Sequence, residues 1–154
     1  MNKDLSFDVV VIGGGHAGCE AAAAAARMGV KTGLFTHKIQ TIGEMSCNPA
    51  IGGLGKGHLV KEIDALDGVM GVVADKSGIQ FRLLNRSRGP AVQGPRTQSD
   101  RALYKKHMQE LLLSYCNLKV FSDPVIEFVF FKNKIIGFHT QSGKKINCKK
   151  MILT

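Results

Sequence analysis

The chain has 154 residues, enough to bury one hydrophobic core, and no internal repeat, low-complexity linker or change of composition marks a domain boundary. Its 21 Lys and Arg outweigh its 12 Asp and Glu, and the net charge of +9 suits polyanionic partners such as nucleic acid. Four scattered cysteines without a C-x-x-C pair argue against a disulfide framework or a metal site, and the lack of a long apolar segment argues against a signal peptide or membrane span, so we expect a cytoplasmic protein.

The N-terminal segment predicts the order strand, tight turn, helix, strand. Residues 7–12 form an almost unbroken apolar run, typical of a strand buried on both faces of a parallel sheet. Gly13, Gly15 and Gly18 follow at G-x-G-x-x-G spacing, and six consecutive alanines continue as a helix with a small face. A second strand over residues 30–35 completes a βαβ unit, so we predict an α/β, Rossmann-like fold.

The glycines at this spacing suit phosphate binding. Gly13 permits the tight turn, Gly15 lets backbone approach a pyrophosphate, and Gly18 lets the helix pack closely on the strand. The anion would lie on the N–H groups of the helix N-terminus, where the helix dipole favours negative charge. A purely structural turn is the alternative for such a motif alone, but the flanking strand and helix favour dinucleotide binding.

The generic fingerprint also includes an acidic residue that this chain lacks. An Asp or Glu at the end of the second strand normally holds the ribose hydroxyls. Here the strand ends in Thr36, His37 and Lys38, with no carboxylate. The absence weakens the case for free NAD at this site. Thr36 offers a weaker hydrogen bond, and the two basic residues either face a phosphate or are solvated.

Residues 46–57 combine a cysteine with an unusual density of glycines. Cys47 precedes Asn48-Pro49, and four glycines follow within ten residues. Such a density indicates either close backbone approach or backbone with positive φ angles, as in a loop wrapped on a planar cofactor or an anion. Lys56 is followed by glycine, so the segment is not a P-loop. Residues 58–66 then show the apolar spacing of an amphipathic helix.

Positively charged residues are concentrated at Arg82, Arg86, Arg88, Arg96, Arg101, Lys105 and Lys106, with Lys144, Lys145, Lys149 and Lys150 later in the chain. Residues 82–96 also hold glycines and prolines. We interpret this segment as an exposed loop that presents guanidinium groups to phosphates of RNA or of a cofactor, with a simply solvated loop as the alternative. A helix over residues 99–115 and strands over 120–131, 134–140 and 145–153 follow. By analogy with large flavoprotein folds, these strands form a meander that crosses one face of the nucleotide-binding sheet.

Taken together, these motifs resemble the N-terminal part of the MnmG family, also called GidA. The resemblance spans nearly the whole chain, and the Ser46-Cys-Asn-Pro49 segment makes it far more specific than the glycine fingerprint alone. The family is similar in lacking the carboxylate after the second strand. The matching residues are Gly13, Gly14, Gly15, His16, Ala17, Gly18, Thr36, His37 and residues 45–53, 55–62, 64–66, 78–82, 84–85, 89–92 and 100–101.

This resemblance implies an FAD-dependent enzyme that adds a carboxymethylaminomethyl group at C5 of the wobble uridine of certain tRNAs. FAD would lie on Gly13 to Gly18 and touch the backbone at Val125, and Cys47 matches one of two cysteines proposed to act in redox or covalent chemistry. Methylenetetrahydrofolate would give the one-carbon unit, NADH would reduce the flavin, and glycine or ammonium would supply the amine. The implied partners are tRNA, the GTPase MnmE and a second copy in a homodimer.

For Cys47, a nucleophilic role competes with that of an inert thiol. A nearby helix N-terminus and Lys56 would favour the thiolate, which is the nucleophilic form of cysteine. The commoner role of a cytosolic cysteine is a buried and unreactive one. With the resemblance taken into account, both readings stay open.

The sequence ends at Thr154, where members of the family continue into an NADH-associated region and a C-terminal helical region. We therefore expect residues 1–154 to be the N-terminal part of an FAD/NAD(P)-binding domain, with no second domain and no tRNA-modifying turnover by itself. The alternatives are a non-enzymatic cofactor-binding remnant and another flavin enzyme. Lack of C-x-x-C argues against a disulfide reductase, and residues 46–53 favour MnmG over a folate-dependent tRNA uracil methyltransferase.

Overall fold

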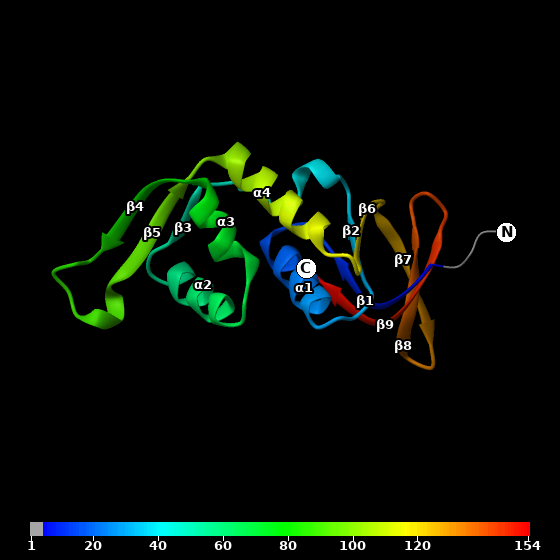
Figure 1. Cartoon of the computed structure of the whole chain (residues 1–154). Helices are drawn as coiled ribbons and strands as arrows, with labels where there is room; N and C mark the ends of the chain where they lie inside the picture. Colours follow the sequence, from blue (N-terminus) through cyan, green and yellow to red (C-terminus); the bar gives the residue numbers. More distant parts are fainter. Residues whose placement is uncertain (1–4) are drawn as a thin grey trace. The chain divides into compact units, whose positions relative to one another are not determined.

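The computed structural model describes residues 5–154, which form two compact units (Figure 1). Of the described residues, the first unit contains 5–42 and 112–154, and the second contains Gly43–Leu111. The elements in chain order are β1 (Leu5–Ile12), α1 (His16–Arg27), β2 (Thr32–Thr36), η1 (Ile39–Thr41), β3 (Ala50–Gly52), α2 (Lys56–Ala65), α3 (Val69–Ser77), β4 (Gly78–Leu84), η2 (Pro90–Val92), β5 (Gly94–Ser99), α4 (Arg101–Ser114), β6 (Leu118–Ser122), β7 (Val125–Phe131), β8 (Lys134–Thr140) and β9 (Lys145–Leu153).

A six-stranded sheet forms the first unit, in the order β6-β2-β1-β9-β8-β7. The strands β6, β2, β1 and β9 are parallel to one another, whereas β8 pairs antiparallel with β9, and β7 pairs antiparallel with β8. Every residue of β2 is buried, as expected for a strand that has parallel neighbours on both sides and is covered on both faces. The α/β, Rossmann-like fold predicted from the βαβ pattern is confirmed.

Helix α1 contacts β1 and β2 through short side chains. Its buried residues are Gly18, Cys19, Ala22, Ala23, Ala25 and Ala26. Because these side chains extend so little, the helix axis can lie close to Val11 and Leu34, which are completely buried. The Asn117 side-chain amide donates hydrogen bonds of 2.9 Å to the carbonyl of Ala26 and 2.8 Å to that of Val30, and so joins the end of α1 to the start of β6.

The meander formed by β7, β8 and β9 belongs to the same sheet and also folds over one of its faces. β8 pairs only with the first part of β9, at residues 145–147. In a flat sheet β8 would lie about 14 Å from β2, three strand spacings away. Instead, the Phe138 ring of β8 makes an edge contact with the Phe35 ring of β2, with ring centroids 4.9 Å apart. Phe35 also stacks on Phe121 at 4.5 Å. The predicted crossing of the sheet therefore occurs, through a curled hairpin.

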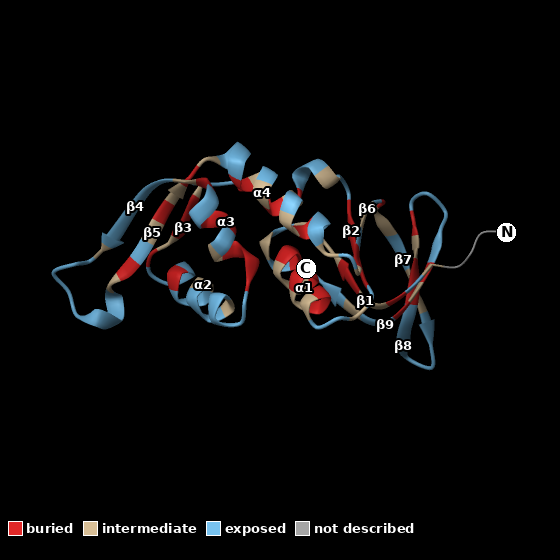
Figure 2. Cartoon of the chain, in the orientation of Figure 1, coloured by how far each residue is buried: buried red, intermediate tan, exposed pale blue. Residues whose placement is uncertain are grey.

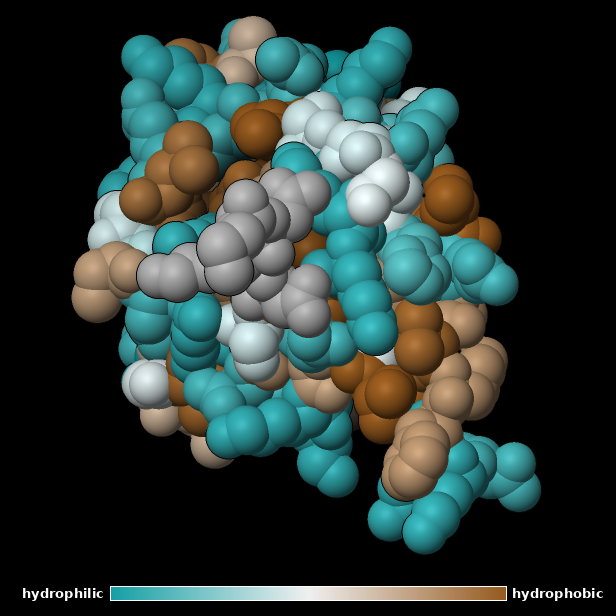
Figure 3. Space-filling model, turned by 90° about the vertical axis from the view of Figure 1, so that its right-hand side faces the viewer, coloured by the Kyte–Doolittle hydropathy of each residue, from teal (hydrophilic) through white to brown (hydrophobic). Residues whose placement is uncertain are grey.

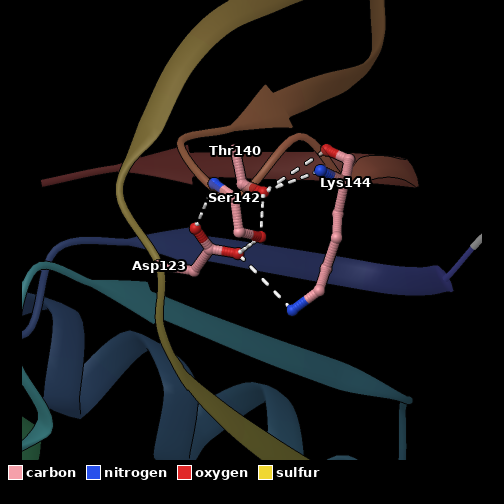
Figure 4. A network of polar contacts seen from close by, with 4 residues as sticks. All are labelled: Asp123, Thr140, Ser142 and Lys144. Carbon is pink, nitrogen blue, oxygen red and sulfur yellow. Dashed lines mark hydrogen bonds and ion pairs between the residues drawn. The ribbon is translucent and has the colours of Figure 1, made fainter.

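The predicted strand over residues 120–131 is wrong, because Asp123 and Pro124 separate β6 from β7. Asp123 is buried and accepts hydrogen bonds from the Ser142 hydroxyl (2.6 Å) and the Ser142 N–H (3.1 Å), as Figure 4 shows. Lys144 Nζ lies 3.7 Å from the same carboxylate. Burial by itself raises the pKa of Asp123, but the bonds from Ser142 and Thr140 and the charge of Lys144 outweigh it, so the pKa lies below the ordinary value. The network fixes the connection into β7.

The second unit has a three-stranded antiparallel sheet in the order β3-β5-β4, with α2 and α3. Residues 82–96, predicted as a continuous exposed loop, instead begin in β4 and end in β5, with a connection over residues 85–93 that includes η2. Ile79, Phe81 and Leu83 alternate with polar residues along β4, which is the pattern of a strand. The arginines and glycines of the segment obscured this pattern in the sequence. All three of these apolar residues are exposed, as is most of β4 (Figure 2).

Exposed apolar side chains occur on the first unit as well. On the face shown in Figure 3, hydrophobic groups are separated by hydrophilic ones. The β7–β8 hairpin contributes Ile126, Phe130, Phe131, Ile135 and Ile136, which are between 38% and 65% exposed. No helix within residues 5–154 is long and apolar enough to cross a membrane.

Candidate functional site

The carboxyl ends of β1, β2, β6 and β9 lie at one edge of the parallel sheet, the usual location of ligand sites in open α/β folds. Hydrogen bonds connect the loops there. The Gly13 N–H donates to Phe35 O at 2.9 Å, and the Asp123 N–H donates to Thr36 O at 3.0 Å. The Ser122 hydroxyl donates to His37 O at 3.1 Å. The glycine turn and the segments that follow β2 and β6 therefore lie at the same edge of the sheet and are connected by hydrogen bonds.

The turn from Gly13 to Gly18 has geometry that requires glycine at two positions and leaves space at a third. Gly13 has φ +115°, a conformation that other residues rarely adopt. A Cβ on Gly18 would lie 2.0 Å from Gly13 O, so only glycine lets α1 begin so close to β1. Gly15, in contrast, has no atom within 4 Å of an added Cβ. Its outer side is open to a ligand, next to the N-terminus of α1 at His16.

Thr154, which follows β9, is hydrogen-bonded to the residue that precedes this turn. Thr154 donates two hydrogen bonds of 3.0 Å to Ile12 O, one from its N–H and one from its hydroxyl. A Cβ on Gly13 would lie 2.4 Å from the same hydroxyl oxygen. The contact between β9 and the glycine turn could not be read from local sequence, because the two segments are about 140 residues apart.

Thr36, His37 and Lys38 differ in their exposure at the sheet edge. Thr36 is buried, and its hydroxyl would lie 2.9 Å from a Cβ on Gly14, so the side chain packs beneath the glycine turn. His37 and Lys38 are exposed. Of these three, only the two basic side chains extend into solvent at the edge where a dinucleotide would lie.

Val125 is the first residue of β7 and is half-buried. Its side chain packs against the core cluster that contains Phe7, Phe35 and Phe138. It follows Asp123 and Pro124, which lead away from the carboxyl end of β6. The structure thus places Val125 at the start of β7, two residues after Asp123, and a contact between its backbone and a cofactor stays a prediction.

Cys47 lies in the second unit, in an exposed segment that side chains of β5 and α4 hold in place. Its carbonyl accepts a 2.6 Å hydrogen bond from Arg101 Nη2, and the neighbouring Asn48 Oδ1 accepts a 3.3 Å bond from Gln98 Nε2. The thiol is free and exposed. Lys56 Nζ donates to Ala50 O at 3.1 Å, so its ammonium group is engaged with the backbone. Cys47 is accessible to a reactant, unlike the buried Cys19 and Cys148.

Three of the glycines after Cys47, namely Gly52, Gly53 and Gly55, have positive φ angles, which is one of the two geometries that their density predicts. Gly52 has φ +117°, and an added Cβ would lie 2.1 Å from Pro95 O on β5. Gly55 has φ +74° and precedes α2. His58, not predicted as important, accepts a 3.2 Å hydrogen bond from the Gly55 N–H through Nδ1, and its Nε2 bonds to Ala91 O at 3.2 Å. It therefore joins the start of α2 to the β4–β5 connection.

Comparison with known proteins identifies the family. Residues 8–154 match the family described as glucose inhibited division protein A. The chain belongs to this family. The resemblance expected from the glycine fingerprint and from residues 46–53 is therefore confirmed.

GidA from Aquifex aeolicus is similar to this chain in sequence and structure. In one crystal form the TM-score is 0.94 at 49% identity, over 97% of this chain and 25% of the other. This chain thus spans about a quarter of the length of that relative. The other crystal form gives a TM-score of 0.93 at the same 49% identity.

More distant structures share the fold. A geranylgeranyl bacteriochlorophyll reductase-like protein from Thermoplasma acidophilum has a TM-score of 0.65 at 19% identity, over 99% of this chain and 40% of that one. PqsL from Pseudomonas aeruginosa, described as a probable FAD-dependent monooxygenase, has a TM-score of 0.65 at 13% identity, over 95% of this chain and 41% of that one. At these identities the likeness concerns the fold alone, which is the α/β, Rossmann-like fold described above.

Proposed function

We propose that this chain is the FAD-binding part of an enzyme that modifies C5 of the tRNA wobble uridine. The main support is the Gly13–Gly18 turn, which lies where the carboxyl ends of the parallel strands meet, in a chain 49% identical to Aquifex aeolicus GidA. The residues present fit a dinucleotide, because Gly15 leaves open space beside the N-terminus of α1 while Gly13 and Gly18 shape the turn. When bound, the flavin would supply hydride and electron transfer.

Each group of residues has a distinct part in this proposal. Backbone N–H groups of Gly14 to Gly18 would hold the pyrophosphate, helped by the dipole of α1. Val125 would contact the cofactor through its backbone. Cys47 would act as a nucleophile or redox group, which its exposed thiol permits. The side chain of Arg101 would keep the Cys47 backbone in position through its 2.6 Å hydrogen bond.

This chain spans 25% of the length of the Aquifex relative, so the complete reaction is part of a proposal for the whole protein. NADH as reductant, methylenetetrahydrofolate as one-carbon donor, the GTPase MnmE and a homodimeric state belong to the proposal for the whole protein. This polypeptide by itself would bind FAD without modifying tRNA. A sensitive tRNA modification assay that detected product from the purified chain would contradict this.

Replacing Gly15 by alanine separates FAD binding from folding. Gly15 has φ −73° and no atom within 4 Å of an added Cβ, so Gly15→Ala should fold normally. The new methyl group would occupy the space into which the pyrophosphate approaches, so FAD affinity should fall about tenfold or more, at least 1.4 kcal/mol. The measurement is flavin absorbance and fluorescence on titration with FAD, with circular dichroism on the same samples.

Gly89→Ala is the matched control, because Gly89 also has open space and an extended backbone, with φ −62°. It should leave both the fold and the FAD affinity unchanged. Equal FAD affinity in the wild type and Gly15→Ala would show that the glycine turn does not hold the cofactor. A wild-type chain that folds but binds no FAD would reject the proposed function of this domain.

A further inference from the structure

The β4–β5 ladder pairs two arginines directly with each other. In its register Arg82 lies opposite Arg96, and Gln80 lies opposite Gln98. Like charges at directly opposed positions of an antiparallel pair are destabilising. The segment from Gly78 to Ser99 contains no Asp or Glu that would compensate them. The fold therefore retains an unfavourable pairing where neutral residues would be more stable.

Both arginines lie on the open face of the three-stranded sheet. Side chains alternate between faces along a strand, so Arg96 and Gln98 point away from the intervening Thr97. Thr97 is buried and lines a pocket together with residues of α2 and α3, which marks its face as the one that the helices cover. On the opposite face a pocket of about 170 Å³ is lined by Gln80, Arg82, Leu84, Arg96 and Gln98.

Among residues 5–154 neither guanidinium group has an ion-pair partner. The salt bridges in this part of the chain pair Glu110, Asp123 and Asp8 with lysine or histidine side chains. Two guanidinium forks in one pocket match the oxygen atoms of a phosphate group, which each can bind through paired N–H donors. The flanking Gln80 and Gln98 add amide donors and acceptors for the sugar or base next to that phosphate. The pocket thus has donors and charge but no internal anion.

We propose that this Arg82–Arg96 pocket binds a phosphate group of a nucleic acid or nucleotide. Phosphates from an RNA backbone and from a dinucleotide cofactor share this chemistry. RNA fits better, because Arg86 and Arg88 are exposed in the same β4–β5 connection and extend the row of positive charge beyond what one pyrophosphate can occupy. The choice of RNA as the ligand rests on the proposed function. The phosphate site itself rests on the pairing of Arg82 with Arg96 in the β4–β5 ladder and on the pocket that they line.

The test replaces both arginines by glutamine, as Arg82→Gln with Arg96→Gln. Glutamine removes the charge and keeps a polar side chain of similar length on each strand. Binding of a labelled single-stranded oligouridine is measured by fluorescence anisotropy over a range of salt concentrations, and FAD binding by absorbance. We expect RNA affinity to fall, with the slope of log affinity against log salt reduced by about 0.7, the value for one lost phosphate contact on a single strand. The melting temperature should stay equal or rise, because the repulsion between the arginines is removed.

The matched control is Lys134→Gln with Lys145→Gln, which removes the same charge from exposed positions on β8 and β9. The control should leave the salt slope unchanged. Loss of FAD affinity with unchanged RNA binding would assign the phosphate to the cofactor. If the arginine variant binds both RNA and FAD as tightly as the wild type does, the site is overturned. It is also overturned if the control variant loses as much RNA affinity as the arginine variant does. A wild type that binds FAD but no RNA would instead reject the tRNA part of the proposed function.

Discussion

At the scale of single residues, Asp123 shows how one buried carboxylate defines a loop. It accepts two hydrogen bonds from Ser142 and lies near Lys144, which together hold its pKa below the ordinary value of 3.8 despite burial. Asp123→Asn places an amide where Ser142 donates, so we expect a loss of about 1–3 kcal/mol of unfolding free energy near neutral pH. Urea denaturation measures this loss, and exposed Asp75→Asn should change stability by less than about 0.5 kcal/mol.

The depressed pKa of Asp123 also predicts how stability depends on pH. The carboxylate is more acidic in the folded chain than in the unfolded one, so its stabilising effect is fully present above the unfolded pKa of about 3.9 and is lost as pH falls through the folded pKa. The wild type should therefore lose stability below about pH 4 more steeply than Asp123→Asn. Parallel stability curves for the two proteins in this range would contradict the assignment.

At the scale of elements, the curled β7–β8 hairpin depends on Phe138. This side chain is completely buried and touches Phe35 of β2, whereas Phe130 on the same hairpin is 62% exposed. Phe138→Ala should lower the free energy of unfolding by about 3–5 kcal/mol, because it leaves a cavity between the hairpin and the sheet. Phe130→Ala should change it by less than about 0.5 kcal/mol. Similar losses for the two variants in urea denaturation would show that the hairpin does not cover the sheet.

At the scale of the whole molecule, the net charge of +9 predicts that RNA binding is largely electrostatic. If about four phosphates are contacted, raising salt from about 50 mM to about 200 mM should weaken binding of single-stranded RNA about fifty-fold, through counterion release. Fluorescence anisotropy over a salt series measures the slope. An affinity that does not change with salt would exclude this mode of binding.

Local sequence was sufficient for much of the first unit. The apolar run of β1, the spacing of Gly13, Gly15 and Gly18 and the alanines of α1 predicted strand, turn and helix, because each is a property of neighbouring residues. β8 and β9 match their predicted bounds for the same reason. The elements of residues 69–99 were missed. In that segment arginines and glycines obscured the strand pattern of β4 and β5. These two strands form because they pair with each other, and local sequence does not show that pairing.

The sequence by itself determined the family, the fold class and the glycine turn, because these depend on residue types at short, fixed spacings. Tertiary structure decided the rest, where distant segments meet. It placed Thr154 against Gly13, Phe138 on Phe35 and Arg101 on the Cys47 carbonyl. It also set Arg82 opposite Arg96, a relation that depends on strand register. Such contacts arise from how the strands pair and the chain packs, and no local pattern specifies them.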